Sequence, residues 1–308
     1  VVAYGTARKG DLTGALTTMR PDANEAAKAV SIDNLLEGKV AGLVVSTASS
    51  NPGAASSITI RGASSLRGDN QPLYVIDGVP MLNIGTEQAY SAIGGTANAG
   101  NRDGGDGISN LNPEDVESIS ILKGAPAAAL YGSQAANGVI LITTKKGNTA
   151  GQRNIHFSTG LTFDKAFSLP KMQNCYGVSD VVDSWGEKTY LPTSNELNDF
   201  FRTGLTSITS VSVNYGNEKI QTYFSYANTT GRGIVDKNQL TKHNINLRET
   251  AVMFNQRLKL DGNVNVMRQI VKNKPVSGGF YMNPLVGLYR FPRGEDLSYY
   301  KDNYEIYD

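Results

Sequence analysis

The feature that most constrains this chain is the alternation of apolar and polar residues in its second half. Residues 154–167 read NIHFSTGLTFDKAF, and Ile155, Phe157, Leu161 and Phe163 fall on one side of an extended chain. The same period of two recurs in residues 208–231, 240–249 and 256–270. Successive side chains of a strand point to opposite faces, so each segment would have one apolar and one polar face.

This pattern predicts about five antiparallel strands, and the second and third of them are joined by a turn at Gly216-Asn217. Strands of roughly ten residues with one apolar face suit a transmembrane barrel or a large soluble β-sandwich, and periodicity alone leaves both open. No stretch reaches the ~18 apolar residues of a spanning helix. Without a signal peptide before Val1, we expect a mature segment or a truncated chain.

A sharp change in aromatic content predicts a domain boundary. Phe, Trp and Tyr together occur 4 times before residue 151 and 21 times from there onward. We therefore predict one unit at residues 1–150 and a second at residues 151–308, with the seam in KKGNTAGQRN, residues 145–154. A length of 308 residues is enough for two units, each with its own core.

The first unit has the pattern of a small α/β fold. Its segments are rich in Ile and Val and bounded by Gly, Pro, Asn and Asp, which predicts strands at residues 42–49, 56–62, 72–78, 116–122 and 138–145. Helix-start signals predict helical segments at residues 31–40, 112–115 and 125–132. Residues 83–110 predict a long surface loop. Five glycines are expected to serve as backbone devices, namely Gly62, Gly78, Gly124, Gly132 and Gly138.

The chain offers little to catalysis, metal binding or nucleic-acid binding. One cysteine excludes an intramolecular disulfide and a cysteine-based zinc site, and two histidines, His156 and His243, exclude a histidine-rich metal centre. A net charge of +1 without a basic stripe argues against nucleic acid. The sequence lacks a G-x-S-x-G elbow and a P-loop, and residues 101–110 fail the calcium-loop spacing. We therefore predict no catalytic residue, metal or cofactor.

Three segments of the first unit carry a family resemblance. They are LLEGKVAGLVV (35–45), SITIRGASSLRGDNQPLYVIDGVPM (57–81) and GISNLNPEDVESISILKGAPAAALYGSQAANGVILITTKKG (107–147). Together they resemble the plug domain of TonB-dependent outer-membrane transporters, and the ending YGSQAANGVILITTKKG is typical of the SusC/RagA branch. Residues 200–235 are similar to the first barrel strands of that branch.

The resemblance implies an α+β plug, a small mixed sheet with short helices, followed by antiparallel strands of a transmembrane barrel. Plugged transporters of this kind have about 22 strands. A chain with about five such strands cannot close that barrel, so we expect an incomplete barrel and a fragment of a longer protein.

The resemblance also implies a function at the outer membrane of Gram-negative bacteria. The expected activity is TonB-dependent import of large solutes, either oligosaccharides or oligopeptides, together with a SusD-like lipoprotein that caps the barrel. The segment VVAYGT resembles the end of a Ton box, which would pair with TonB by strand addition through Val1, Val2, Ala3, Tyr4 and Gly5. The alternative for this segment is a frayed plug strand.

Loops of the first unit supply the candidate substrate contacts, because glycans and peptides need dense hydrogen bonding. The candidates are Arg61, Arg67, Asp69, Asn70, Gln71, Asn83, Asn101, Arg102 and Asp103. Arg61 is equally suited to an ion pair with a carboxylate of the barrel wall. Three other functions stay open at this point: a β-rich surface adhesin, a siderophore-type receptor and, less favoured without an acid pair or nucleophile, a glycan hydrolase.

Overall fold

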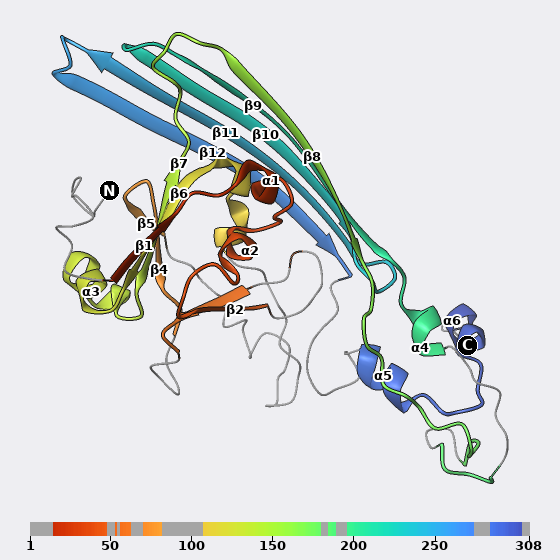
Figure 1. Ribbon diagram of the computed structural model, residues 1–308. Coiled ribbons are helices and arrows are strands. Elements are labelled where there is room, and N and C mark those ends of the chain that lie inside the picture. Colours follow the sequence, from red (N-terminus) through yellow and green to blue (C-terminus); the bar gives the residue numbers. More distant parts are fainter. Residues whose placement is uncertain are drawn as a thin grey trace, which may run out of the picture.

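The computed structural model describes residues 15–47, 53, 56–62, 70–81, 107–179, 184–188, 196–273 and 284–303. Two bodies of different construction lie against each other (Figure 1). One, here called the small domain, comprises the elements from β1 to β7. The other, here called the wall, is the five-stranded sheet from β8 to β12.

The small domain is built on a mixed sheet of five short strands. Its order is β1 (Ala15–Met19), β6 (Val116–Lys123), β7 (Val139–Thr144), β4 (Leu73–Ile76) and β5 (Val79–Met81). Strands β4 and β7 are parallel, and the other neighbours are antiparallel. A separate hairpin-like pair joins β2 (Leu43–Thr47) to β3 (Ser56–Ile60).

Short helices complete the small domain, and none exceeds seven residues. They are α1 (Ala23–Ala26), α2 (Ile32–Leu36) and α3 (Ala125–Tyr131), together with the 3-10 turns η2 (Ile108–Asn110), η3 (Pro113–Asp115) and η4 (Gly132–Ala135). Such lengths are marginal for isolated helices, so packing must hold them in place. A capping box between Ser31 and Asn34 starts α2.

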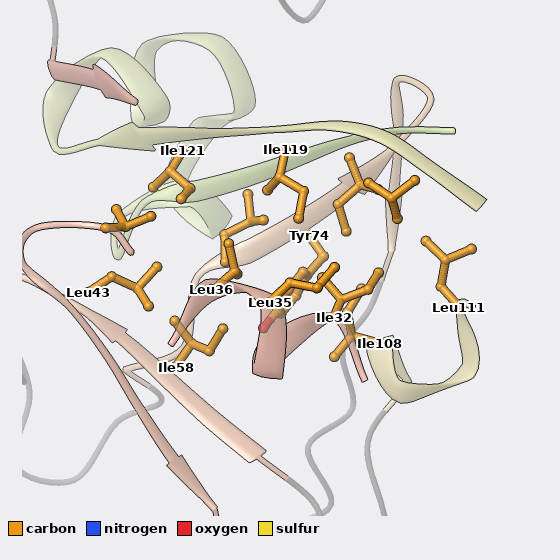
Figure 2. Close-up of a cluster of buried hydrophobic side chains, with 14 of the residues drawn as sticks. Ile32, Leu35, Leu36, Leu43, Ile58, Tyr74, Ile108, Leu111, Ile119 and Ile121 are labelled. Carbon is orange, nitrogen blue, oxygen red and sulfur yellow. The ribbon is translucent and has the colours of Figure 1, made fainter. Parts of the chain in front are cut away.

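Two apolar clusters sandwich the central strands of the small domain. On one face Ile119 and Ile121 pack with α2 and the β2–β3 pair, and Figure 2 shows Leu35, Leu36 and Ile58 converging on them. On the other face α3 and η4 cover the cluster of Val75, Leu122, Ala127, Ala135, Val139 and Leu141. Because β7 is buried on both faces, its sequence is a continuous apolar run rather than an alternation.

The predicted backbone role of five glycines is confirmed, since Gly62, Gly78, Gly124, Gly132 and Gly138 all have positive φ. Gly138 is the most constrained of them, with a φ of 100°. A Cβ there would lie 2.9 Å from Ile60 Cδ1 and 3.0 Å from the Leu122 carbonyl oxygen. Glycine is required at this position for its conformation and for its space.

The wall consists of five antiparallel strands in chain order, as the alternation predicted. They are β8 (Asn154–Asp164), β9 (Gly204–Gly216), β10 (Ile220–Arg232), β11 (Gln239–Met253) and β12 (Leu258–Lys272). Short turns at residues 217–219 and 254–257 lie at one end, here called the turn end. The longer connections, residues 165–203 and 233–238, lie at the other, here called the loop end, where Figure 1 also places α4 (Glu196–Phe200), α5 (Pro284–Arg290) and α6 (Leu297–Asp302).

Several elements differ from the sequence-based expectation. Strand β1, strand β5 and helix α1 were not predicted, and the helix expected at residues 31–40 ends at Leu36. Strand β5 follows β4 across a tight turn at Asp77-Gly78, both with positive φ, so a single strand was expected where a hairpin forms. In the described part of the chain, no helix has the length and apolarity to cross a membrane.

Candidate functional site

The inner face of the wall, which faces the small domain, carries a buried row of polar side chains. On β11 this row is Lys242, Asn244, Asn246, Arg248 and Thr250, each at most 4% exposed. Isolated buried polar groups are costly, so such a row must be matched by partners across the seam. The small domain supplies partners to the first four of these residues, from the end of β4, from β7 and from η2 and η3, whereas the Thr250 hydroxyl has no hydrogen-bond partner within the described residues.

Arg248 lies at the centre of the largest charged group in the seam. Its guanidinium forms a bidentate pair with Asp261 on the neighbouring strand β12, with both N–O distances at 2.9 Å. It also reaches Asp77 of the small domain at 2.9 Å and donates to the Thr144 hydroxyl at 2.6 Å. We call Arg248, Asp77, Asp261 and Thr144 the Arg248 cluster.

Asp77 is positioned by the small domain itself. It follows β4 in a left-handed conformation, and its carboxylate accepts from the Thr144 amide at 3.0 Å and the Thr144 hydroxyl at 2.5 Å. The carboxylate therefore ties β4 to β7 and both strands to the wall. Lys146 adds a second cation, 3.3 Å from Asp261. Paired, hydrogen-bonded charges of this kind resist separation, because removing one partner leaves the other buried and uncompensated.

A second polar group surrounds η3. Asp115 is fully buried, its Oδ1 accepts from the Tyr223 hydroxyl at 2.9 Å, and its Oδ2 accepts from the Asn246 amide at 3.4 Å. Burial raises the pKa of Asp115, and the hydrogen bonds from these wall residues oppose that rise. The adjacent Glu114 carboxylate accepts from the hydroxyls of Ser158 and Ser210.

Two further contacts extend the seam toward the loop end. Lys242 Nζ donates to the Ser109 carbonyl at 2.5 Å, and Asn244 Nδ2 donates to the Asn110 carbonyl at 2.8 Å. The side chains of β11 thus donate hydrogen bonds to backbone carbonyls of η2 and to the Asp115 carboxylate of η3. Four consecutive inner positions of one strand fix the small domain along its length.

A cavity of about 330 Å³ opens beside the Arg248 cluster. Helix α3 covers only one end of its face of the sheet, and the uncovered end carries hydroxyls. The lining comprises Thr18, Ser118, Ser120, Thr143 and Tyr131 with the charged Asp77, Lys146, Arg248 and Asp261, besides apolar neighbours. This arrangement suits hydration and polar solutes. Within the described residues, no three His, Cys, Asp or Glu side chains gather to hold a metal ion.

The residues predicted from sequence to touch substrate lie elsewhere. Arg61, Asn70 and Gln71 are described, and Gln71 precedes β4 whereas Asp77 follows it, so the two lie at opposite ends of that strand. Arg61 is exposed, has a φ of 61° and donates its amide to the Gly42 carbonyl at 2.7 Å. The remaining candidates lie outside the described residues, namely Arg67, Asp69, Asn83, Asn101, Arg102, Asp103 and the TonB-contact residues Val1, Val2, Ala3, Tyr4 and Gly5.

Sequence reasoning missed the seam itself. Glu114 and Asp115 were assigned to a helix start, and the polar face of residues 240–249 was noted without a partner. The usable signal was the alternation in KHNINLRE, which places Lys242, Asn244, Asn246 and Arg248 on one face. A row of buried donors on one strand face needs acceptors opposite it, and the small domain supplies Asp77 to Arg248, Asp115 to Asn246 and the Ser109 carbonyl to Lys242.

Comparison with known proteins finds similarity along most of the chain. Residues 8–139 match the TonB-dependent Receptor Plug Domain. The chain is 32% identical over 278 residues to the TonB-dependent receptor SusC of Bacteroides thetaiotaomicron, which covers 87% of this chain and 26% of SusC. It is 37% identical over 174 residues to the TonB-dependent receptor P26 of Formosa agariphila, covering 56% of this chain and 16% of that receptor. The chain therefore spans about a quarter or less of the length of these relatives.

Solved structures give the same fold. The RagAB peptide importer in its open-open state superposes with a TM-score of 0.72 at 22% identity, covering 97% of this chain and 35% of that one. The ferric citrate transporter FecA gives a TM-score of 0.53 at 16% identity over 88% of this chain and 34% of that one. These likenesses support the expected architecture, a mixed-sheet domain followed by antiparallel barrel strands.

Proposed function

Since the chain belongs to the SusC/RagA-like TonB-dependent transporters, outer-membrane proteins of Gram-negative bacteria, we propose that it takes part in active import of large solutes. One observation carries this proposal: the wall turns its polar face to the plug and its apolar face outward. Ile155, Phe157 and Phe163 are 66–74% exposed on the outward face. A lipid-facing barrel with a plugged, polar lumen has this arrangement, whereas a soluble adhesin would bury the apolar side.

The proposed import cycle begins with TonB pulling on the first residues of the chain, Val1 to Gly5. The pull reaches the plug through β1, an edge strand that pairs only with β6 in the described sheet. Opening a path for solute then requires separation of the plug from the wall at the Arg248 cluster, beside the 330 Å³ cavity. Local opening of this kind needs less free energy than unfolding of the whole plug.

Partners and substrates are proposed from the family. We propose a SusD-like lipoprotein as the lid on the extracellular side, and oligosaccharides or oligopeptides as solutes. RagAB is a peptide importer, which supports the second class. We propose no catalytic step and no cofactor. Residues 1–150 are proposed as the plug and residues 151–308 as the first part of the barrel, because β7 ends at Thr144 and β8 begins at Asn154.

The proposed substrate contacts follow the sequence-based candidates. Arg61, Asn70 and Gln71 lie at the end of the plug sheet remote from Asp77 and the turn end of the wall. In outer-membrane barrels short turns face the periplasm and longer loops face outward, so these residues would meet a solute arriving from outside. The same role is proposed for Arg67, Asp69, Asn83, Asn101, Arg102 and Asp103.

Removal of residues 1–6 from the intact transporter tests the proposed function. We expect uptake of a labelled oligosaccharide or oligopeptide to be lost while surface binding of the same solute is retained. Loss of both would point to a misfolded protein, which surface labelling detects. Uptake at the wild-type rate in the deletion variant would refute import driven through this segment.

A further inference from the structure

The outward face of the wall has a second, separate feature: a polar cluster of Arg268, His243 and Asn228 at the border of its apolar surface. The strand register divides this face into rows. Two successive rows are apolar, one of Ile155, Val213, Phe224, Leu247 and Val264 and the next of Phe157, Val211, Tyr226, Ile245 and Val266. The following row, toward the loop end, is polar throughout: Thr159, Thr209, Asn228, His243 and Arg268.

The apolar surface crosses the strands diagonally. On β12 it includes Leu258 and Leu260, on the turn-end side of the two apolar rows. On β8 it includes Leu161 and Phe163, on the loop-end side of those rows. Barrel strands tilt by about 35–45° in the membrane, so a band parallel to the membrane must cross them in this way. Asn228, His243 and Arg268 therefore form the first polar row on the loop-end side of the two apolar rows, and on β12 one further apolar residue, Ile270, follows Arg268.

Within the part of the chain that the structure describes, no carboxylate lies beside the Arg268 guanidinium. On the outward faces of β10, β11 and β12 the single carboxylate is Glu249, six residues from His243, a distance of about 20 Å along the strand. Two rows beyond the cluster lie Arg232 and Lys272, also exposed and in register through Gln239. Arg268 is exposed between Val266 and Ile270, and no contact within the described residues neutralises its charge.

The cluster is organised rather than a chance meeting of side chains. His243 Nδ1 lies 2.9 Å from the Tyr226 hydroxyl and 3.1 Å from Asn228 Nδ2, and the Tyr226 and His243 rings stack with centroids 6.2 Å apart. Nδ1 is thus the ring nitrogen engaged by Tyr226 and Asn228, and Nε2 is the nitrogen left to face a ligand. Arg268 is the register partner of His243 across the strand pair, so the imidazole and a guanidinium occupy facing positions.

We propose that Arg268, His243 and Asn228 bind the phosphate of a lipid headgroup in the outer leaflet. Guanidinium groups recognise phosphate with paired N–H donors, and the imidazole Nε2–H and the Asn228 amide add donors of the same kind. The position of the cluster favours a lipid phosphate over a free phosphate ion. The acyl chains of a lipid held here would lie along the adjoining rows of Ile245, Val266 and Leu247. This inference needs the wall to be embedded in a membrane, but it does not depend on import.

The test uses the intact transporter in detergent, examined by native mass spectrometry during titration with phosphatidic acid. Phosphatidylcholine with the same acyl chains is the reference lipid, because its phosphate is shielded by choline. We expect preferential retention of phosphatidic acid, with roughly ten-fold weaker binding in the Arg268→Gln/His243→Gln double variant, as for loss of a charge-assisted hydrogen bond. Arg257→Gln, an exposed cation in a short turn at the other end of the wall, is the matched control and should bind like the wild type.

Three results would overturn the proposal. Equal retention of the two lipids would show that the apolar rows alone hold lipid, and unchanged binding in the double variant would place the phosphate elsewhere. Displacement of phosphatidic acid by inorganic phosphate at equal concentration would show a site for the free anion. Solute uptake, measured on the same variants, should be retained in all of them, so its loss would bear on the proposed function and not on the lipid site.

Discussion

Arg248 is the residue whose loss should loosen the seam most. Its side chain is only 5% exposed and is shared between Asp77 of the plug and Asp261 of the wall. In Arg248→Met both carboxylates lose this partner, and breaking a buried pair costs about 3–5 kcal/mol. Hydrogen exchange in detergent should therefore show faster local opening of β4 and β7.

The comparison for this variant is Arg257→Met, which removes the same charge from an exposed turn at the same end of the wall. We expect wild-type exchange there, because isolated surface charges contribute little. If Arg248→Met and Arg257→Met exchange alike in β4 and β7, the Arg248 cluster does not hold the plug.

Asp115 should give the seam a pH dependence of known sign. Burial raises its pKa above the ordinary value of 3.8, so the folded state binds the proton more tightly than the unfolded state. Its stabilising contribution is complete below pH 3.8 and is lost as the pH rises through the folded-state pKa. Asp115→Asn cannot ionise, and its carbonyl oxygen still accepts from Tyr223. The stability of this variant relative to wild type should therefore increase as the pH rises from 3.8 and then level off.

Calorimetry of the intact transporter at a series of pH values measures this difference. Asp236→Asn is the control, because Asp236 pairs with Arg202 at the loop end and its side chain is 48% exposed. A relative stability of Asp115→Asn that falls with rising pH would contradict the assignment.

At the scale of elements, strand β1 is the first described strand of the plug sheet and follows the segment proposed to contact TonB. Its residues pair antiparallel with β6, and Thr18 lies opposite Ser120 with the two hydroxyl oxygens 3.0 Å apart. Facing residues of an antiparallel pair are close enough for a disulfide. Cysteines at both positions, with Cys175 replaced by serine, should lock β1 to β6 under oxidising conditions.

If TonB opens the plug by peeling β1 from the sheet, the oxidised variant should bind solute at the surface but fail to import it. Reduction with a membrane-permeant thiol should restore uptake. Normal uptake by the oxidised protein would show that the plug opens without losing the β1–β6 pairing, and each single-cysteine variant controls for the substitutions.

The elements differed in how well the sequence predicted them. Strand β7 and the wall strands were predictable because burial on both faces or on one face leaves a clear pattern of apolar residues. Strand β1 reads ALTTM and has neither pattern, because it is an edge strand fixed by pairing with β6. Strand β5 had a usable signal that the prediction missed, because Asp77-Gly78 is a typical dipeptide of a two-residue hairpin turn in which both residues have positive φ.

At the scale of the whole molecule, the alternation fixed which residues of the wall share a face but not which face meets water. A barrel and a sandwich place the same residues on the same two sides. The position of the plug distinguishes the two architectures. The plug packs against the polar side of the wall, where Asn244, Asn246 and Arg248 are buried beneath it. The partners in the seam lie far apart in the sequence, such as Asn246 and Asp115, which are 131 residues apart, so no local pattern could predict them.

The apolar face of the wall points outward. The cost of placing a charge on this face should therefore depend on whether the face meets lipid or water. Phe224 lies on the outward face of the central strand β10, inside the two apolar rows. In a bilayer Phe224→Arg should destabilise the intact transporter by about 2–4 kcal/mol, because a charge near the mid-plane is expensive there. Thr209→Arg, at the border row of the adjacent strand, should cost about 0–1 kcal/mol, because a charge near the interface reaches water and headgroups.

Urea-induced unfolding of the protein reconstituted in phosphatidylcholine vesicles measures both values. The difference between Phe224→Arg and Thr209→Arg is the quantity of interest, because both variants add the same side chain to the same face. If the outward face met water instead of lipid, Phe224→Arg would be close to neutral. A penalty for Phe224→Arg no larger than that for Thr209→Arg would therefore reject the lipid-facing assignment of this surface.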